Sequence, residues 1–255
     1  MLPLHFNRPV VIIGMHRSGT SLVAKVLHEA GINMGVERDH NEESLPFLSI
    51  NQKMMSESGN SWIDPLKNDA QYHSPESALS MYVNHFKIDP NDYALGGKPR
   101  SWYLKFAHNT PWGFKDPRNT FTLNAWLELF PNAKVIHVTR HPAAVADSLA
   151  RRNEIDGEVH DERLNDLQFN LNLWKVYVDE AMKQMDSIPA SRKRTIQYER
   201  LLQGGKELTD LGRFVGADLV AGFAARVHPD RANHHPDLDL SSVAEEMKIL
   251  GYTDN

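Results

Sequence analysis

The stretch VVIIGMHRSGTSLVAKVL, residues 10–27, contains the pattern on which the fold prediction rests. A short β-branched run ends at Gly14, four residues separate it from Gly19, and hydroxyl side chains then open a helical pattern. Continuous apolar runs are typical of buried parallel strands, and apolar residues at steps of three and four indicate a helix. The stretch therefore predicts a strand over 9–14, a phosphate-binding turn and a helix over 20–30.

The turn lacks the lysine that ATP-binding loops place directly after their second glycine. That position is Thr20, and the cation of the loop is Arg17. Backbone N–H groups and the positive end of the helix can hold an anion here. The arginine adds a fork of donors, and Ser18, Thr20 and Ser21 add hydroxyls. A group with less charge than a terminal phosphate, such as the sulfuryl group of a phosphosulfate, suits this loop.

Strand and helix patterns alternate along the rest of the chain. The alternation predicts an α/β fold with a P-loop-type, mostly parallel sheet and helices on both faces. Strands are expected over 112–115, 134–139 and 194–198, and helices over 120–129, 142–150, 164–182, 208–215 and 242–250. Ser242 and Glu245 are spaced as a capping box for the last helix.

We expect residues 1–255 to form a single domain. Residues 31–110 carry weak patterns, which indicate helices and long loops inserted after the first strand and helix. We expect this insertion on the side of the site where a second substrate, the acceptor, would bind. Residues 217–255 read as a C-terminal extension. Five aromatic residues of the insertion could stack on a flat acceptor or belong to the core: Trp62, Tyr72, Tyr82, Tyr93 and Trp102.

The composition excludes several classes of protein. The chain has 255 residues and 41% hydrophobic residues, which suits one large α/β domain. Its net charge of −5 argues against an extended nucleic-acid surface, and the absence of cysteine removes disulfides, thiolate metal sites and cysteine nucleophiles. No signal peptide and no apolar run of about 18 residues are evident, so we expect a soluble, cytoplasmic protein.

A second motif, VTRHPAAVADS, places Arg140 at the end of a strand and Ser148 two turns into the next helix. Both side chains could contact one phosphate at the edge of the sheet. Arginine is also common at strand ends and serine on helices, so the motif by itself leaves both interpretations open.

The segments GMHRSGTS, WGFKDPR, FPNAKVIHVTRHPAAVADSL and YERL together resemble sulfotransferases that use 3′-phosphoadenosine 5′-phosphosulfate (PAPS), above all bacterial, carbohydrate-type and tyrosylprotein-type members. The resemblance implies a P-loop-type sheet, PAPS as co-substrate and the 3′,5′-bisphosphate PAP as product. It implies that the loop His16, Arg17, Ser18, Gly19, Thr20 and Ser21 holds the phosphosulfate, that Arg140 and Ser148 hold the 3′-phosphate, and that Tyr198 lies near the adenosine.

The chain departs from the cytosolic members of that family in two places. Leu22 stands where they carry a tryptophan that packs on the adenine, and their glycine-rich C-terminal segment is absent. A basic stretch with Arg226 and Arg231 could substitute for that segment.

Sulfuryl transfer needs an activated acceptor, in-line alignment and stabilisation of charge on the leaving phosphate. Arg17 and Lys115 are the candidates for stabilising that charge. Glu43, which precedes Ile50-Asn51 at the distance seen in resembling bacterial members, is the candidate base, and we expect nearby Arg17 to keep it ionised. The other candidates in this segment are Glu37, Asp39, Glu42 and above all His40.

Other polar residues are expected to have structural or binding roles and to take no direct part in the reaction. Asp116 and Glu199 fit structural roles, and Arg118 fits a salt bridge or a contact with the nucleotide. No metal is required, because the cations supply the charge. His234 and His235 are adjacent, with no acidic or cysteine partner at ligand spacing.

Two other functions fit parts of the sequence: a nucleotide or small-molecule kinase with a degenerate loop, and a nucleotide-binding module without catalysis. The missing loop lysine counts against the first, and Lys115 with a base candidate counts against the second. The acceptor hydroxyl or amine could belong to a small molecule, a saccharide or a lipid, and the sequence leaves its identity and the oligomeric state open.

Overall fold

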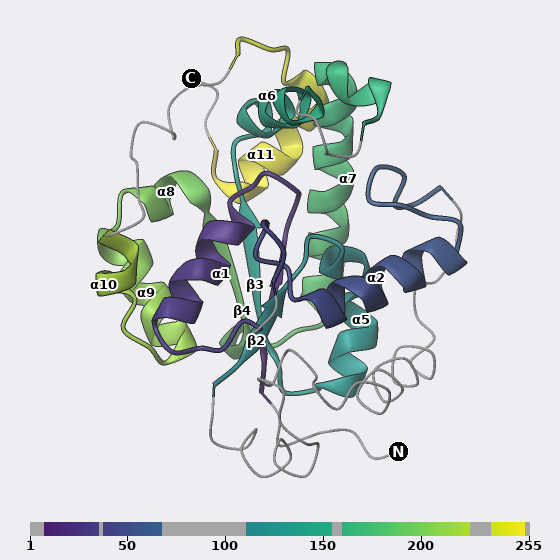
Figure 1. The fold of residues 1–255 in the computed structure, drawn as a ribbon. Coiled ribbons are helices and arrows are strands. Elements are labelled where there is room, and N and C mark those ends of the chain that lie inside the picture. Colours follow the sequence, from purple (N-terminus) through teal and green to yellow (C-terminus); the bar gives the residue numbers. More distant parts are fainter. Residues whose placement is uncertain (1–7, 36–37, 68–110, 155–159, 225–235, 253–255) are drawn as a thin grey trace.

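Four parallel strands form the centre of the fold in a computed structural model that describes residues 8–35, 38–67, 111–154, 160–224 and 236–252. The strands are β1 (Val10–Ile13), β2 (Gly113–Lys115), β3 (Lys134–Thr139) and β4 (Lys193–Gln197). They pair in the order β2-β1-β3-β4 (Figure 1). All carboxyl ends therefore meet at one edge, where ligands of such sheets bind.

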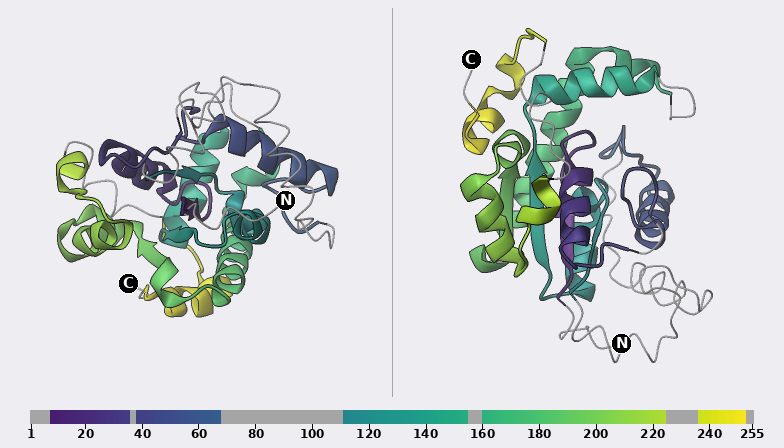
Figure 2. Two further views of the ribbon diagram at one scale, coloured as in Figure 1. Left: turned by 90° about the horizontal axis from the view of Figure 1, so that it is seen from below. Right: turned by 60° about the vertical axis from the view of Figure 1, so that its left-hand side comes forward.

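Both faces of the sheet are covered by helices, as predicted (Figures 1 and 2). Alternate residues of β1 point to opposite faces, Val11 into one buried cluster and Ile12 into another. The first face packs against α2 (Leu45–Glu57), α5 (Asn119–Leu129) and α7 (Leu167–Asp186). The second packs against α1 (Thr20–Glu29), α8 (Tyr198–Leu202), α9 (Gly205–Val215) and α10 (Val220–Ala224). The α/β fold class is confirmed.

The inserted segment contributes α2, whose Phe47 stacks on Phe114 of β2 with ring centroids 3.9 Å apart. The Trp126 ring from α5 packs against Phe47 in a T-shaped arrangement, with ring centroids 5.3 Å apart. Such aromatic packing fixes α2 against the sheet. Residues 68–110, with four of the five aromatic residues named above, lie outside the described residues.

A third cluster joins α6 (Pro142–Asn153) and α7 to the C-terminal extension. Trp174 of α7 is fully buried there together with Val243 and Met247. The part of the extension in this cluster contains two short helices, the 3-10 turn η5 (Ser241–Val243) and α11 (Ala244–Leu250).

The predicted capping box of the last helix is wrong. Because residues 241–243 form a 3-10 turn, the residue that caps α11 is Val243, without a side-chain hydrogen bond. The Ser242 hydroxyl instead accepts a hydrogen bond from Gln168 Nε2 at 3.0 Å.

Other boundaries shift by a few residues. The helix predicted over 164–182 spans 167–186, because 3-10 helix η2 (Glu162–Asn165) precedes it and Asp166 caps α7 through the Gln168 amide. Another 3-10 turn, η3 (Ala190–Arg192), leads into β4. Tyr198 begins α8 and does not end the strand. No helix in the described parts of the chain is long and apolar enough to cross a membrane.

Candidate active site

A cavity of about 660 Å³ opens at the carboxyl ends of the strands. The residues predicted from sequence that line it are His16, Arg17, Gly19, Thr20, Ser21, Glu43, Lys115, Arg140, Ser148 and Tyr198. Ser18 is not among the lining residues: it is fully buried and its hydroxyl donates to the Met15 carbonyl at 2.7 Å. Segments distant in sequence thus converge where the fold places ligands.

The first loop has a tightly constrained backbone. Arg17 has a φ of 67°, in the left-handed region that side chains rarely adopt. Gly19 has a φ of 94°, and a Cβ there would lie 2.2 Å from Cδ2 of Tyr198. The Gly14 amide donates to the Thr120 hydroxyl at 3.0 Å, which ties the loop to α5. Strain held in this way is common at binding sites.

One wall of the cavity brings together the residues predicted for the nucleotide. Arg17 Nε donates to the Ser148 hydroxyl at 3.0 Å, and an Nη atom of Arg140 donates to the Arg17 carbonyl at 3.2 Å. The Arg140 guanidinium lies 5.0 Å from the centre of the Tyr198 ring, within cation–π range. The first loop and the segment from Arg140 to Ser148 are therefore hydrogen-bonded to each other without a ligand.

Contacts from α7, α8 and the C-terminal extension support this wall. Trp174 Nε1 donates to the Arg140 carbonyl at 3.1 Å. The Glu199 carboxylate accepts from the His141 amide at 2.8 Å and from the Tyr252 hydroxyl at 3.2 Å. Burial, and secondarily the negative charge of Glu199, raises the pKa of Tyr252 well above its ordinary value, so the hydroxyl stays protonated as a donor.

Arg151 and Arg152, which were not predicted from the sequence, also line the cavity. They follow Ser148 by three and four residues on α6, a spacing that places them on the face of Ser148. The predicted helix ended at Ala150, which hid the pattern. With Arg17, Lys115 and Arg140 they make five cations around one carboxylate, a local excess of positive charge suited to an anionic ligand.

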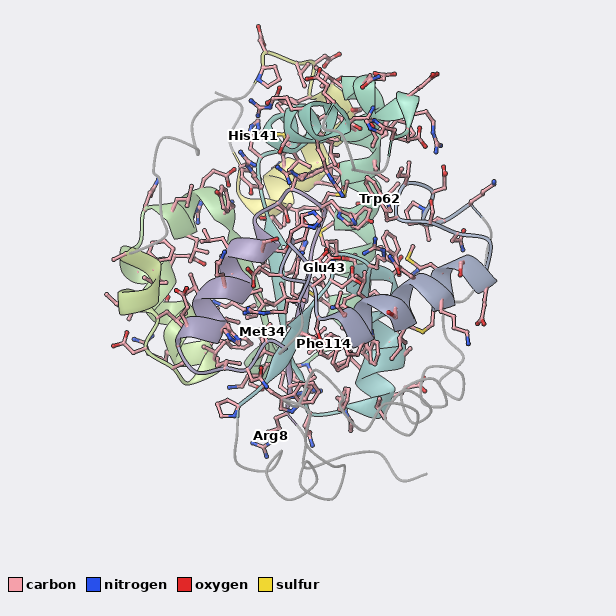
Figure 3. All side chains as sticks on the ribbon, in the orientation of Figure 1. Arg8, Met34, Glu43, Trp62, Phe114 and His141 are labelled. Atoms are coloured by element: carbon pink, nitrogen blue, oxygen red, sulfur yellow. The ribbon has the colours of Figure 1, made fainter. Side chains whose placement is uncertain are left out.

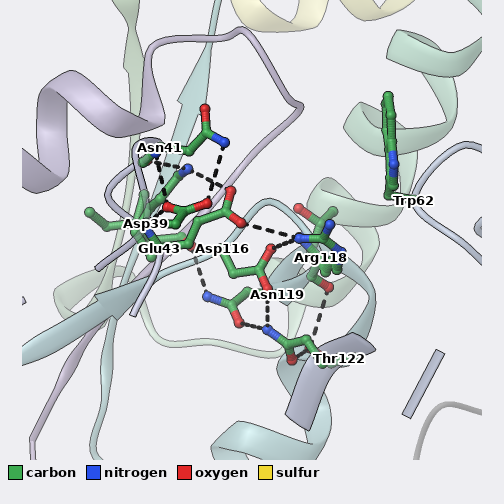
Figure 4. A network of polar contacts seen from close by, with 12 residues as sticks. Asp39, Asn41, Glu43, Trp62, Asp116, Arg118, Asn119 and Thr122 are labelled. Carbon is green, nitrogen blue, oxygen red and sulfur yellow. Dashed lines mark hydrogen bonds and ion pairs between the residues drawn. The ribbon is translucent and has the colours of Figure 1, made fainter. Parts of the chain in front are cut away.

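Glu43 is presented by a tight turn ahead of α2. The Asp39 carboxylate accepts hydrogen bonds from the backbone amides of Asn41 at 2.9 Å and Glu43 at 2.8 Å, a local alternative to helix that aspartate favours. Figure 4 shows Glu43 pointing from this turn toward Arg118. His40 is exposed, and its ring contacts the Asn41 amide rather than lining the cavity.

Lys115 forms a buried ion pair with Glu43. Its Nζ lies 2.9 Å from Glu43 Oε1, and the two side chains are only 2% and 4% exposed. The same ammonium donates to the Asn41 carbonyl at 2.9 Å and to the Ser21 hydroxyl at 3.4 Å. Lys115 therefore links the first loop to the turn that carries Glu43.

Arg118 completes the environment of Glu43, with an Nη atom 3.3 Å from Oε2. Burial raises the pKa of Glu43 above its ordinary value, and Lys115 and Arg118 only partly oppose this. The cations in contact with Glu43 are thus Lys115 and Arg118, whereas the sequence pointed to Arg17. Arg17 bonds to Ser148, and the cations paired with Glu43 come from the end of β2 and the start of α5.

His16 packs its ring on Trp62, with centroids 4.5 Å apart, and Trp62 lies on the side of the site toward α7 (Figure 3). Burial lowers the pKa of His16 well below its ordinary value, and Arg118, Arg152, Lys115 and Arg17 add to the effect. The imidazole is therefore neutral at neutral pH. Its Nε2 has no hydrogen-bond partner among the described residues.

No cluster of three or more histidine, aspartate or glutamate side chains in the described part of the chain is arranged to hold a metal ion. His234, His235, Arg226 and Arg231 lie outside that part.

Comparison with known proteins assigns the family. The family model of the sulfotransferase family matches residues 9–219, so the chain belongs to that family. The sulfotransferase domain of the olefin synthase from Synechococcus PCC 7002 has a similar structure, with a TM-score of 0.63 and 19% identity over 100% of this chain and 99% of that one. No curated protein sequence matches the chain.

Two further structures share the fold. The sulfotransferase domain from the curacin biosynthetic pathway has a TM-score of 0.60 and 15% identity over 99% of both chains. A sulfotransferase from Alicyclobacillus acidocaldarius has a TM-score of 0.50 and 13% identity, over 96% of this chain and 97% of that one. At these identities the likeness concerns the fold.

Proposed function

We propose that the protein transfers the sulfuryl group of PAPS to a hydroxyl or amine of a small-molecule, saccharide or lipid acceptor, and releases PAP. The observation that carries the proposal is the convergence on one cavity of the first loop, the Arg140–Ser148 pair and the buried Lys115–Glu43 pair. Membership of the sulfotransferase family supports it.

The nucleotide would bind along the cationic wall. The first loop and the start of α1 offer backbone N–H groups and hydroxyls to the 5′-phosphosulfate. Arg140 and Ser148 would take the 3′-phosphate, and the Tyr198 ring would pack beside the adenosine. Arg17 belongs to the first loop and is hydrogen-bonded to both Ser148 and Arg140. Its guanidinium can therefore stabilise the negative charge that builds on the bridging oxygen.

The acceptor would enter beside Glu43. A carboxylate within hydrogen-bond reach of the acceptor can take its proton as the sulfur–oxygen bond forms. Lys115, already in contact with Glu43 and Ser21, is placed to move one hydrogen bond onto a sulfuryl oxygen. No step requires a metal ion, because arginine and lysine supply the charge.

Ligand stabilisation separates this function from the kinase alternative. PAP and PAPS should raise the melting temperature, since a ligand that binds the folded state stabilises it, and more so the more tightly it binds. ATP with magnesium should give a smaller shift, because the loop lacks the lysine for the terminal phosphates. Stabilisation by ATP–magnesium but not by PAP would overturn the proposal. Transfer of labelled sulfate from PAPS in an acceptor screen then separates an enzyme from a binding module.

Substitutions in the cationic wall should weaken PAP binding in a graded way. Arg140→Ala should cost about 1.5–3 kcal/mol, the value of a charged hydrogen bond, and Ser148→Ala about 0.5–1.5 kcal/mol. Calorimetric titration measures both. Arg213→Ala is the matched control, because this exposed arginine pairs with Asp210 away from the cavity. Unchanged affinity in the first two variants would remove them from the binding site.

A further inference from the structure

Arg118 lies between two buried carboxylates. The same Nη atom donates to Asp116 Oδ1 at 3.0 Å and to Glu43 Oε2 at 3.3 Å. Asp116 is completely inaccessible to solvent and Glu43 is 3% exposed. One positive group is therefore divided between two negative ones, and the shorter contact goes to Asp116.

Two further hydrogen bonds fix the position of the Asp116 carboxylate. Its Oδ1 also accepts from the Arg118 amide at 2.9 Å, and its Oδ2 accepts from Asn51 Nδ2 at 2.9 Å. Asn51 lies in α2, the helix that begins two residues after Glu43. The helix that follows the candidate base thus reaches back to anchor the carboxylate that competes for its arginine.

The Asn51 amide is itself saturated, which fixes its orientation. Its Nδ2 also donates to Asn119 Oδ1 at 2.8 Å, and its Oδ1 accepts from the Thr122 hydroxyl at 2.8 Å and from Trp126 Nε1 at 3.0 Å. Figure 4 shows Asn119 and Thr122, two members of this network, beneath Glu43 and Arg118. Fully satisfied buried networks of this kind are stiff.

The charged groups around Glu43 come from three segments. Lys115 ends β2, Asp116 and Arg118 lie in the turn between β2 and α5, and Asp39 bonds to the Glu43 amide from within the turn ahead of α2. Burial raises the pKa of Glu43 and the Asp116 carboxylate raises it further, while Lys115 and Arg118 lower it. Removing the charge of Asp116 therefore has a defined sign.

We propose that Asp116, anchored by Asn51, is a positioning residue that draws Arg118 away from Glu43 and so keeps Glu43 a stronger base than a carboxylate paired fully with arginine. The arrangement of charges stands by itself, and only its role in turnover rests on the proposed function. Without Asp116, Arg118 would turn to Glu43, stabilise its ionised form and weaken it as a proton acceptor.

The test is a direct titration of Glu43 by carbon NMR, with glutamate labelled at the carboxyl carbon. The resonance is assigned by its absence in Glu43→Gln. In Asp116→Asn, Glu43 should titrate at lower pH than in the wild type. Thr122→Val is the matched control, because it removes an uncharged member of the same buried network. In this control, Glu43 should titrate at the same pH as in the wild type, even if the substitution lowers the stability of the protein.

Asp116→Ser is a second variant in case Asp116→Asn folds poorly, since serine leaves room for water and still offers an acceptor to the Arg118 amide. An unchanged titration of Glu43 in the folded variant, or an equal shift in Thr122→Val, would overturn the proposal.

Kinetics separate this proposal from the proposed function. If PAPS turnover is found, Asp116→Asn should lower it less than Glu43→Gln does, move the acidic limb of the pH profile to lower pH and leave PAP affinity unchanged. A shifted titration without any sulfuryl transfer in the wild type would support the positioning role and refute the sulfotransferase assignment of the site. Sulfuryl transfer by the wild type, together with an unchanged acidic limb and an unchanged titration of Glu43 in Asp116→Asn, would support the sulfotransferase function and refute the positioning role of Asp116.

Discussion

Glu43→Gln should lower turnover with PAPS by about a hundred- to ten-thousandfold, the usual contribution of a general base. The amide keeps the shape of the side chain and removes its ability to take a proton. Because Glu43 lies beside Lys115 and Arg118 rather than among the residues proposed for the 3′-phosphate, PAP affinity should stay nearly unchanged. Steady-state kinetics and calorimetry measure the two quantities.

Two neighbours provide the controls for this variant. Glu42→Gln alters the adjacent glutamate, which pairs with Lys25 at 3.3 Å and with Arg38 and does not line the cavity. Its turnover should match that of the wild type. His40→Ala tests the competing base. If Glu43→Gln kept more than about a tenth of its turnover while His40→Ala lost it, the role of base would pass to His40.

Lys115→Met should lower the free energy of unfolding by about 3 kcal/mol and should also abolish most turnover. Breaking a buried ion pair leaves the other charge poorly compensated, which typically costs about 3–5 kcal/mol. Arg118 remains beside Glu43, so the lower end of that range applies. Urea unfolding measures stability, and the surface variant Lys53→Met, which loses only an exposed pair with Glu57, should stay within about 0.5 kcal/mol of the wild type.

The destabilisation by Lys115→Met should depend on pH with a definite sign. The pKa of Glu43 is already raised in the folded protein by burial, and loss of Lys115 raises it further. Ionisation of Glu43 then opposes folding at neutral pH and ceases to do so once the group is protonated. The difference in unfolding free energy should therefore narrow as pH falls toward the ordinary pKa of a carboxyl group. A difference independent of pH would mean that packing, and not charge, is lost.

The central elements of the fold could be predicted from sequence because their causes are local. The run before Gly14, the turn and the stripe of the first helix lie within twenty residues, and β3 was predicted with its observed boundaries, 134–139. Boundaries failed where short 3-10 turns precede helices, at η2 and η5, since these depend on individual hydrogen bonds and not on periodicity.

Of the site, the sequence by itself identified the residue types and the segments that carry them. It placed Arg140 and Ser148 on either side of one strand-to-helix turn, where spacing along the chain fixes their separation in space. It missed Arg151 and Arg152, although helical spacing from Ser148 would have found them once the helix was extended to Asn153.

Only the tertiary structure decided which charges meet. Glu43 pairs with Lys115 at a sequence separation of 72 residues and with Arg118 at one of 75, while Arg17 bonds to Ser148 at a separation of 131. Periodicity says which face of an element is buried, but not which side chains meet when distant elements pack together. The basicity of Glu43 depends on burial and on those partners together. For that reason, the sequence could nominate Glu43 as the base but not its ion-pair partners Lys115 and Arg118, which the packing of α2 against β2 and α5 brings to it.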